Sequence, residues 1–146
     1  MDKMRIMLVD DEEGFLLTTK KLLERKGIHV ITASSGQEAL EKLVGESVHV
    51  VVLDVKMPGM DGVAVLKAIK SSYPLIQVVM LTGHGTVESA LEGLRSGATD
   101  YLMKPIDIDE LIAKADEAFV RWRIMGEKIR AADRAAAADK ATEKKT

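Results

Sequence analysis

The sequence predicts an α/β protein whose parallel sheet is doubly wound, with helices on both faces. Several short runs are rich in Val and Ile and mostly unbroken rather than alternating, as expected for strands that are covered on both sides. Between them lie segments whose apolar residues recur at helical spacing. Strands that alternate with helices in this way predict parallel pairing and right-handed crossovers. The chain has 146 residues, 47% of them hydrophobic, which suits one domain with a real core.

Five strands are predicted, in chain order. The apolar runs are IMLV (6–9), IHVITA (28–33), VHVVVL (48–53) and IQVVML (76–81), followed by the weaker TDYLMK (99–104). Each is followed by a helical pattern. The first helix carries apolar residues from Phe15 to Leu23 and stops at Gly27. The other helices are expected over 34–44, 61–74, 86–97 and 107–125, where serine and Asp107 begin the first and last as caps.

A flavodoxin-like arrangement, with strand order 2-1-3-4-5, is the expected topology. It places the first strand beside the third, where the direction of winding reverses, and ligands bind there at the carboxyl ends of the strands. Asp10 and Asp11 follow the first strand and Asp54 ends the third. Carboxylates this close raise one another's pKa unless a cation neutralises them. Mg2+ prefers such oxygen ligands, so the sequence predicts a magnesium site.

A structural interpretation competes with this one for part of the acidic run. Asp11 is a plausible plain helix cap, and Glu12 and Glu13 are favourable in a first helical turn. Asp10 and Asp54 fit that interpretation poorly, because burying a strand-terminal acid costs free energy and neither caps an evident helix.

Two further strand ends face the same crevice. The fourth strand ends at Thr82 and the fifth at Lys104, which precedes Pro105 in a candidate cis peptide that would aim the lysine inward. Carboxylates, a hydroxyl and an ammonium around one opening form a site of the size of a phosphate.

At these positions the chain resembles the receiver domain of bacterial two-component response regulators. The resemblance covers about residues 4–122 and rests on four motifs in the right order: VDDE (9–12), LDVKMPGMDG (53–62), LTGHG (81–85) and YLMKP (101–105). It implies that Asp54 accepts a phosphoryl group from a phosphohistidine on a sensor histidine kinase or phosphotransfer protein. Asp10 and Asp11 would hold Mg2+, completed by Asp54 and the main-chain carbonyl of Lys56.

The resemblance also implies the other roles. Lys104 would pair with the phosphoryl group, Thr82 would bind one of its oxygens, and Tyr101 would rotate inward behind it. The phosphate then biases a two-state equilibrium at the face formed by the helix over 86–97, the strand over 99–104 and the last helix. A homodimer through this face is a further expectation. Glu12 and His84 are expected just outside the residues that touch metal and phosphate.

Several functions remain open. The chain is either a stand-alone switch for a protein partner or a phosphoryl relay, or it is a receiver cut from a longer transcriptional regulator with a DNA-binding or ATPase output. Apart from its own phosphorylation and dephosphorylation, no enzymatic activity is expected. An aspartate-nucleophile phosphatase would need a second acid two residues after its nucleophile, where this chain has Lys56. An FMN-binding flavodoxin is disfavoured because the pocket is acidic.

The remaining sequence features indicate where the protein is located and which partners it can bind. The formal net charge of −2 argues against nucleic-acid binding by this chain, and the absence of cysteine excludes thiol chemistry. With no signal peptide and no long apolar run, a cytoplasmic protein without membrane contact is expected. Residues 1–122 are assigned to the receiver and 123–146 to a helical extension with a charged tail, frayed or disordered. Trp122 is a candidate exposed contact for a second copy.

Overall fold

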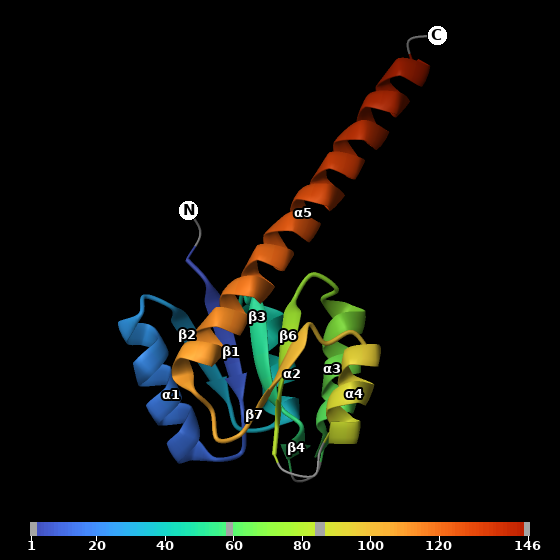
Figure 1. Ribbon diagram of the computed structural model, residues 1–146. Helices are drawn as coiled ribbons and strands as arrows, with labels where there is room; N and C mark the ends of the chain where they lie inside the picture. The colour runs from blue at the N-terminus through green and yellow to red at the C-terminus, as the bar shows by residue number, and fades with distance from the viewer. Residues whose placement is uncertain (1–2, 58–59, 84–86, 145–146) are drawn as a thin grey trace.

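The fold is a five-stranded parallel sheet covered by helices on both faces (Figure 1). The computed structural model describes residues 3–57, 60–83 and 87–144. The strands of the main sheet are β1 (Arg5–Val9), β2 (His29–Ala33), β3 (Val50–Asp54), β6 (Gln77–Thr82) and β7 (Asp100–Met103). Their spatial order is β2-β1-β3-β6-β7, and every pairing is parallel. The predicted order 2-1-3-4-5 is therefore confirmed.

Two very short strands complete the β structure. β4 (Lys56–Met57) and β5 (Met60–Asp61) pair with each other in antiparallel fashion, directly after β3. The sequence analysis did not predict them, because two residues are too few to show any periodicity.

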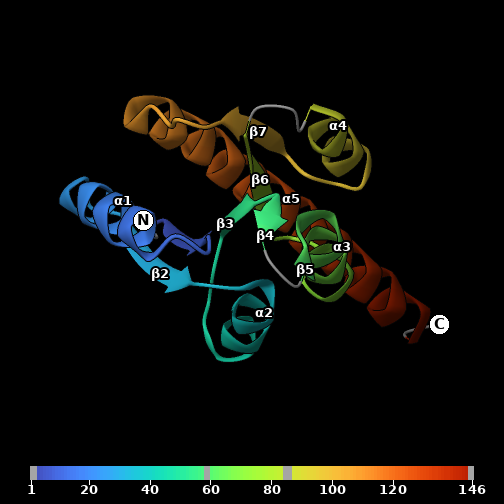
Figure 2. The same cartoon turned by 90° about the horizontal axis from the view of Figure 1, so that it is seen from below.

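The sheet divides the hydrophobic core into two layers, each covered by helices. The helices are α1 (Glu13–Arg25), α2 (Gly36–Gly45), α3 (Gly62–Ser72), α4 (Val87–Arg95) and α5 (Ile108–Lys144). Side chains of α2 and α3 pack on one face of the sheet, and those of α1 and α5 pack on the other. Figure 2 shows these two groups of helices on either side of the strands. Because β3 is buried at every position, it can be apolar from Val50 to Leu53 without exposing a hydrophobic face.

Among the described residues, side-chain caps begin α2, α3 and α5. The hydroxyl of Ser35 accepts a hydrogen bond from the main-chain N–H of Glu38 at 3.1 Å, as the predicted serine cap requires. Asp61 accepts from the N–H of Val63 at 3.0 Å, and Asp107 accepts from the N–H of Asp109 at 2.9 Å. The predicted cap at Asp107 is thus confirmed.

Helix α5 is continuous far beyond the sheet. Its first half is anchored by Leu111, Ala115 and Ala118, which are fully buried, whereas Ile124 and Ile129 are 49% and 47% exposed. Figure 1 shows the second half projecting away from the body of the domain. No break in the helix marks the division expected between residues 122 and 123, and a separate role for residues 123–146 stays a prediction.

The expected exposure of Trp122 is wrong, whereas its contact with a second copy stays a prediction. Its ring is half-buried and meets the ring of His49 edge-on, with the centroids 4.4 Å apart. His49 itself is buried, and its Nδ1 accepts a hydrogen bond from the main-chain N–H of Arg5. Within residues 3–57, 60–83 and 87–144, no helix combines the length and apolar character of a membrane span.

Candidate metal and phosphate site

The carboxyl ends of four strands bring the predicted site residues to one edge of the sheet. Val9 is in register with Leu53, so Asp10 and Asp54 lie on neighbouring strands at the same level. Thr82 ends β6 and is in register with Met103, which puts Lys104 beside it. A one-residue shift of any pairing would send these side chains to the wrong level, so the site depends on the apolar runs that set the register.

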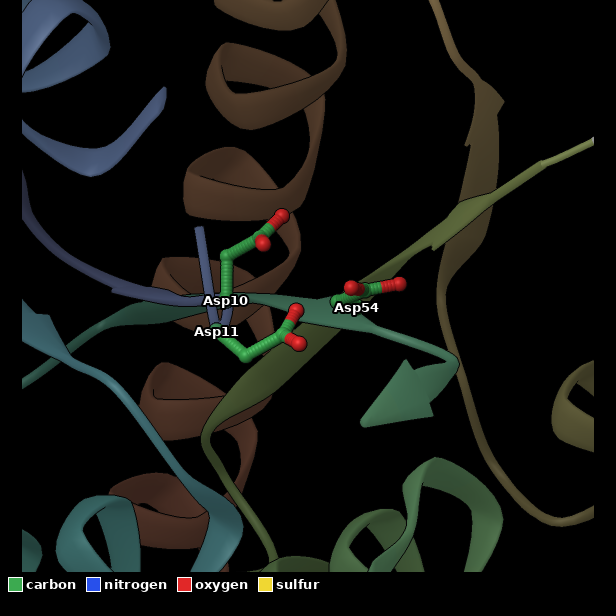
Figure 3. A group of neighbouring side chains, drawn as sticks. All are labelled: Asp10, Asp11 and Asp54. Carbon is green, nitrogen blue, oxygen red and sulfur yellow. The ribbon is translucent and has the colours of Figure 1, made fainter. Parts of the chain in front are cut away.

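Three carboxylates converge at this edge. Oxygen atoms of Asp10, Asp11 and Asp54 lie within 4.8 Å of one another. Asp10 is fully buried and Asp54 is 7% exposed, whereas Asp11 is open to solvent. Figure 3 shows Asp10 and Asp11 extending from the end of β1 toward the side on which Asp54 lies. Closely spaced carboxylates with hard oxygen donors fit a divalent cation, and these three residues can hold one.

Asp10 has a second, structural role that the sequence analysis did not identify. Its Oδ1 accepts a hydrogen bond from the main-chain N–H of Glu12 at 2.9 Å, which fixes the start of the loop before α1. The residue in the N-cap position of α1 is Glu12, and its side chain makes no capping bond. The alternative interpretation of Asp11 as a helix cap is therefore wrong.

Lys104 is the cation of the site. Its Nζ lies 2.7 Å from Oδ2 of Asp10 and 3.6 Å from Oδ2 of Asp54. Burial acts to lower the pKa of this ammonium, but the hydrogen bond and charge of Asp10, with the charge of Asp54, raise it above its ordinary value. The ammonium therefore stays charged and offsets part of the repulsion among the carboxylates. The Lys104–Pro105 peptide is cis, as anticipated.

The hydroxyl of Thr82 and the ring of Tyr101 occupy different environments. Thr82 is buried, and its Oγ1 donates a hydrogen bond to the main-chain oxygen of Leu102 at 3.3 Å. Tyr101 is 40% exposed, and its side chain lies on the outside of β7. The main-chain N–H of Lys104 donates a hydrogen bond to the carbonyl oxygen of Thr82 at 2.7 Å, which joins the ends of β6 and β7 beside the site.

The segment after Asp54 passes very close to α3. A Cβ added at Gly62 would lie 2.6 Å from the carbonyl oxygen of Val55, so only glycine fits where α3 begins. This close approach explains the glycine at the end of the LDVKMPGMDG motif. Lys56 opens β4 two residues after Asp54, and metal binding by its carbonyl stays a prediction. His84 lies outside the described residues.

The structure thus brings together Asp10, Asp11, Asp54 and Lys104, with Thr82 at the adjoining strand end. Glu12 lies next to them, exposed, on the rim of a groove of about 530 Å³ between α1 and the loop after β7. A further contact was not predicted from the sequence: the Nζ of Lys104 is 5.0 Å from the centroid of the Phe15 ring. No sequence spacing signals it, because the residues are brought together only by the packing of α1 beside that loop.

The fold and the site define a flavodoxin-like domain with a buried acidic centre and one paired lysine. The family model described as response regulator receiver domain matches residues 6–116, and the chain belongs to this family.

Individual relatives agree with this assignment. The chain is 41% identical over 117 residues to the transcriptional regulatory protein ZraR of Escherichia coli, covering 80% of this chain and 26% of that protein. It is 37% identical over 116 residues to the DNA-binding transcriptional regulator NtrC of Klebsiella pneumoniae, covering 80% and 25%. The chain therefore spans about a quarter of the length of these curated relatives.

Solved structures show the same fold. A response regulator receiver domain protein from Clostridium thermocellum superposes with a TM-score of 0.80 at 36% identity, covering 84% of this chain and 98% of that one. NtrX from Brucella abortus superposes with a TM-score of 0.82 at 32% identity, covering 88% of this chain and 29% of that one.

Proposed function

We propose that this receiver domain accepts a phosphoryl group on Asp54 from the phosphohistidine of a sensor histidine kinase or phosphotransfer protein. The observation that carries the proposal is the position of Asp54: its carboxylate is nearly buried, lies within 4.8 Å of two other carboxylates, and has the Lys104 ammonium 3.6 Å away. A carboxylate without neighbouring cations would be a poor acceptor for an anionic group, because the incoming charge would be repelled.

The transfer exchanges one bond to phosphorus for another. An oxygen of Asp54 forms the new O–P bond as the N–P bond to the donor imidazole breaks, and the imidazole nitrogen keeps the electron pair and takes up a proton. The product is a mixed anhydride, which hydrolyses readily and so suits a transient signal. Phosphoryl transfer needs mainly positioned charges around the phosphoryl oxygens, and the site offers them.

Mg2+ is the proposed cofactor. Asp10, Asp11 and Asp54 would hold it, with the carbonyl of Lys56 as a further ligand, and once bound it neutralises charge on the carboxylates and the phosphoryl oxygens. Lys104, which follows the carboxyl end of β7, supplies a second positive charge. Its Nζ bonds Asp10 before transfer and turns to a phosphoryl oxygen afterwards.

Thr82 and Tyr101 carry the proposed switch. The phosphoryl group adds close to two negative charges, and the Thr82 hydroxyl can donate to it only by leaving the Leu102 oxygen that it now bonds. That movement opens space behind Thr82 for the ring of Tyr101, which now lies outside. The face formed by α4, β7 and α5 thereby changes shape, and a partner or second copy that prefers one shape reads the signal.

Incubation with Mg2+ and acetyl phosphate tests the proposed acceptor. The wild-type protein should gain one base-labile phosphate, seen as a mass increase, and Asp54→Asn should gain none. Asp61→Asn is the matched control: Asp61 is an exposed acid seven residues away that caps α3, and asparagine also caps helices. Phosphate on Asp54→Asn, or none on the wild type, would refute the proposal.

The module that this receiver would control is inferred from its relatives and not from the site. Because the chain spans only about a quarter of NtrC and ZraR, whose names mark them as transcriptional regulators, we infer that it acts as the receiver part of such a regulator, controlling a DNA-binding or ATPase module. Sequencing the surrounding reading frame tests this directly. If the protein acts alone, its phosphorylated state would instead be recognised by a separate partner protein.

Sedimentation with and without beryllofluoride tests the proposed homodimer through α4, β7 and α5.

A further inference from the structure

The ring of Phe15 lies against the ammonium that serves the phosphoacceptor. The Nζ of Lys104 is 5.0 Å from the centroid of this ring. Phe15 is the third residue of α1 and packs, half-buried, against the core layer under α1 and α5. Its ring also lines the groove of about 530 Å³ that Lys104, Pro105 and Ile106 border from the other side. The core therefore holds the ring, and the ring covers one side of the lysine head.

The contact differs in kind from the other two that Lys104 makes. Asp10 holds the ammonium through a charged hydrogen bond of 2.7 Å, and Asp54 attracts it as an ion pair at 3.6 Å. An aromatic face attracts a cation through its quadrupole and takes up no N–H group in a directed hydrogen bond. It also displaces water from the ammonium, which strengthens the remaining electrostatic interactions. Such a contact keeps the head of the lysine in place while its hydrogen bonds change partner.

Building on the proposed function, we propose that Phe15 is a positioning residue for phosphoryl transfer. Lys104 must exchange a bond to Asp10 for one to the phosphoryl oxygen, and during this exchange the ring limits the ammonium to the small volume beside Asp54. Without the ring, the flexible four-carbon stem lets the ammonium sample the open groove, and it is less often in position when the donor arrives. Phe15 thus acts through Lys104 and touches neither the phosphorus nor the acceptor oxygen.

The test compares three variants with the wild type, using acetyl phosphate and Mg2+. Phe15→Leu keeps apolar bulk but removes the aromatic face, whereas Phe15→Tyr keeps that face. Leu22→Ala is the matched control, because Leu22 lines the same groove on α1. We expect Phe15→Leu to be phosphorylated about fivefold more slowly and Phe15→Tyr and Leu22→Ala to stay within about twofold of the wild type. Circular dichroism melts establish that each variant is folded.

A second measurement reports the contact itself and needs neither metal nor phosphate. In the wild type and Phe15→Tyr, the ring should displace the NMR signals of the Lys104 Hε protons upfield. In Phe15→Leu these signals should return to the range of ordinary lysines. Identical Lys104 shifts in wild type and Phe15→Leu overturn the proposal, and so does a Phe15→Tyr variant as slow as Phe15→Leu.

The two proposals fail in different ways. A wild-type protein that takes up no phosphate overturns the proposed function, and the positioning role with it. A wild type that is phosphorylated normally, alongside a Phe15→Leu variant of equal rate, overturns the positioning role alone.

Discussion

The side-chain hydroxyl of Thr82 donates to the main-chain oxygen of Leu102, 3.3 Å away, and so joins β6 to β7 within the buried end of the sheet. Thr82, which is proposed to bind a phosphoryl oxygen, is therefore already hydrogen-bonded to the residue that follows Tyr101 in β7. Phosphorylation has to compete with this bond, and that competition couples the acceptor to the face on which Tyr101 lies.

Replacing Thr82 by alanine should separate phosphorylation from the switch. Thr82→Ala still presents Asp54, so it should accept phosphate. Because a hydrogen bond to a charged group contributes about 1.5–3 kcal/mol, its loss should reduce the population of the switched conformation more than about tenfold. The measurement is the shift of the Tyr101 ring signals in NMR spectra on phosphorylation, with Thr82→Ser as the hydroxyl-retaining control. Wild-type Tyr101 shifts in phosphorylated Thr82→Ala would contradict the coupling.

Mg2+ should bind to the unphosphorylated protein and stabilise it. At ten times the dissociation constant, ligand binding to the folded state alone adds about 1.4 kcal/mol to the free energy of unfolding. Asp11→Asn removes one of the three converging carboxylates and should weaken binding about tenfold in titration calorimetry. Asp133→Asn, on the far part of α5, should bind like the wild type. Equal affinities for Asp11→Asn and wild type would exclude Asp11 as a ligand.

Gly62→Ala should destabilise the fold. The added methyl group would lie 2.6 Å from the carbonyl oxygen of Val55 and 2.7 Å from its Cα, so backbone has to move. Overpacking of this kind costs about 1–3 kcal/mol, measurable by urea unfolding. Gly45→Ala is the control, because nothing lies within 4 Å of a Cβ built there. A Gly62→Ala variant as stable as Gly45→Ala would mean that the loop after β3 yields freely.

Glu38 should make the stability depend on pH in the acid range. Hydrogen bonds from the Ser34 side chain and from Lys42 hold the pKa of Glu38 at about 2, below its ordinary 4.5. The ionised carboxylate therefore stabilises the folded state above pH 4.5, and this contribution is lost as the pH falls toward 2. Since 35% of the side chain is exposed, the contribution is below about 1 kcal/mol.

The comparison of wild type with Glu38→Gln measures this contribution. Urea unfolding at pH 6 should show the wild type as the more stable protein, and the difference should shrink at pH 3. A difference of the same size at both pH values would assign it to packing instead of charge.

The apolar strand segments were sufficient to predict most of the fold and the cluster of carboxylates. The third run was expected over 48–53 and β3 is Val50–Asp54, so Asp54 fell at a strand end as predicted. Parallel strands meet at their carboxyl ends, and the convergence of Asp10 and Asp54 then follows from topology. Oxygen atoms of Asp10 and Asp54 lie within 4.8 Å of each other, which confirms that argument.

The contacts that could not be predicted from the sequence depend on tertiary packing. Trp122 was expected to be exposed, but the way α5 crosses the sheet brings its ring against the ring of His49. The pairing of Lys104 with a phosphoryl group stays a prediction, and no spacing rule could show that its ammonium lies 2.7 Å from Asp10. Phe15 counted only as an apolar helix residue for the same reason.

The length of α5 gives small movements at the sheet a large effect. Met125 still contacts Gln77 of β6, but residues 130–140 are exposed throughout, and the helix continues to Lys144. At 1.5 Å per residue, residues 130–144 form an arm roughly 22 Å long, so a tilt of the helix by about 10° would move its tip by roughly 4 Å relative to residue 130. A sub-ångström adjustment around Leu111 and Ala115 would thereby be amplified, as by a lever, into a displacement that a bound partner can sense.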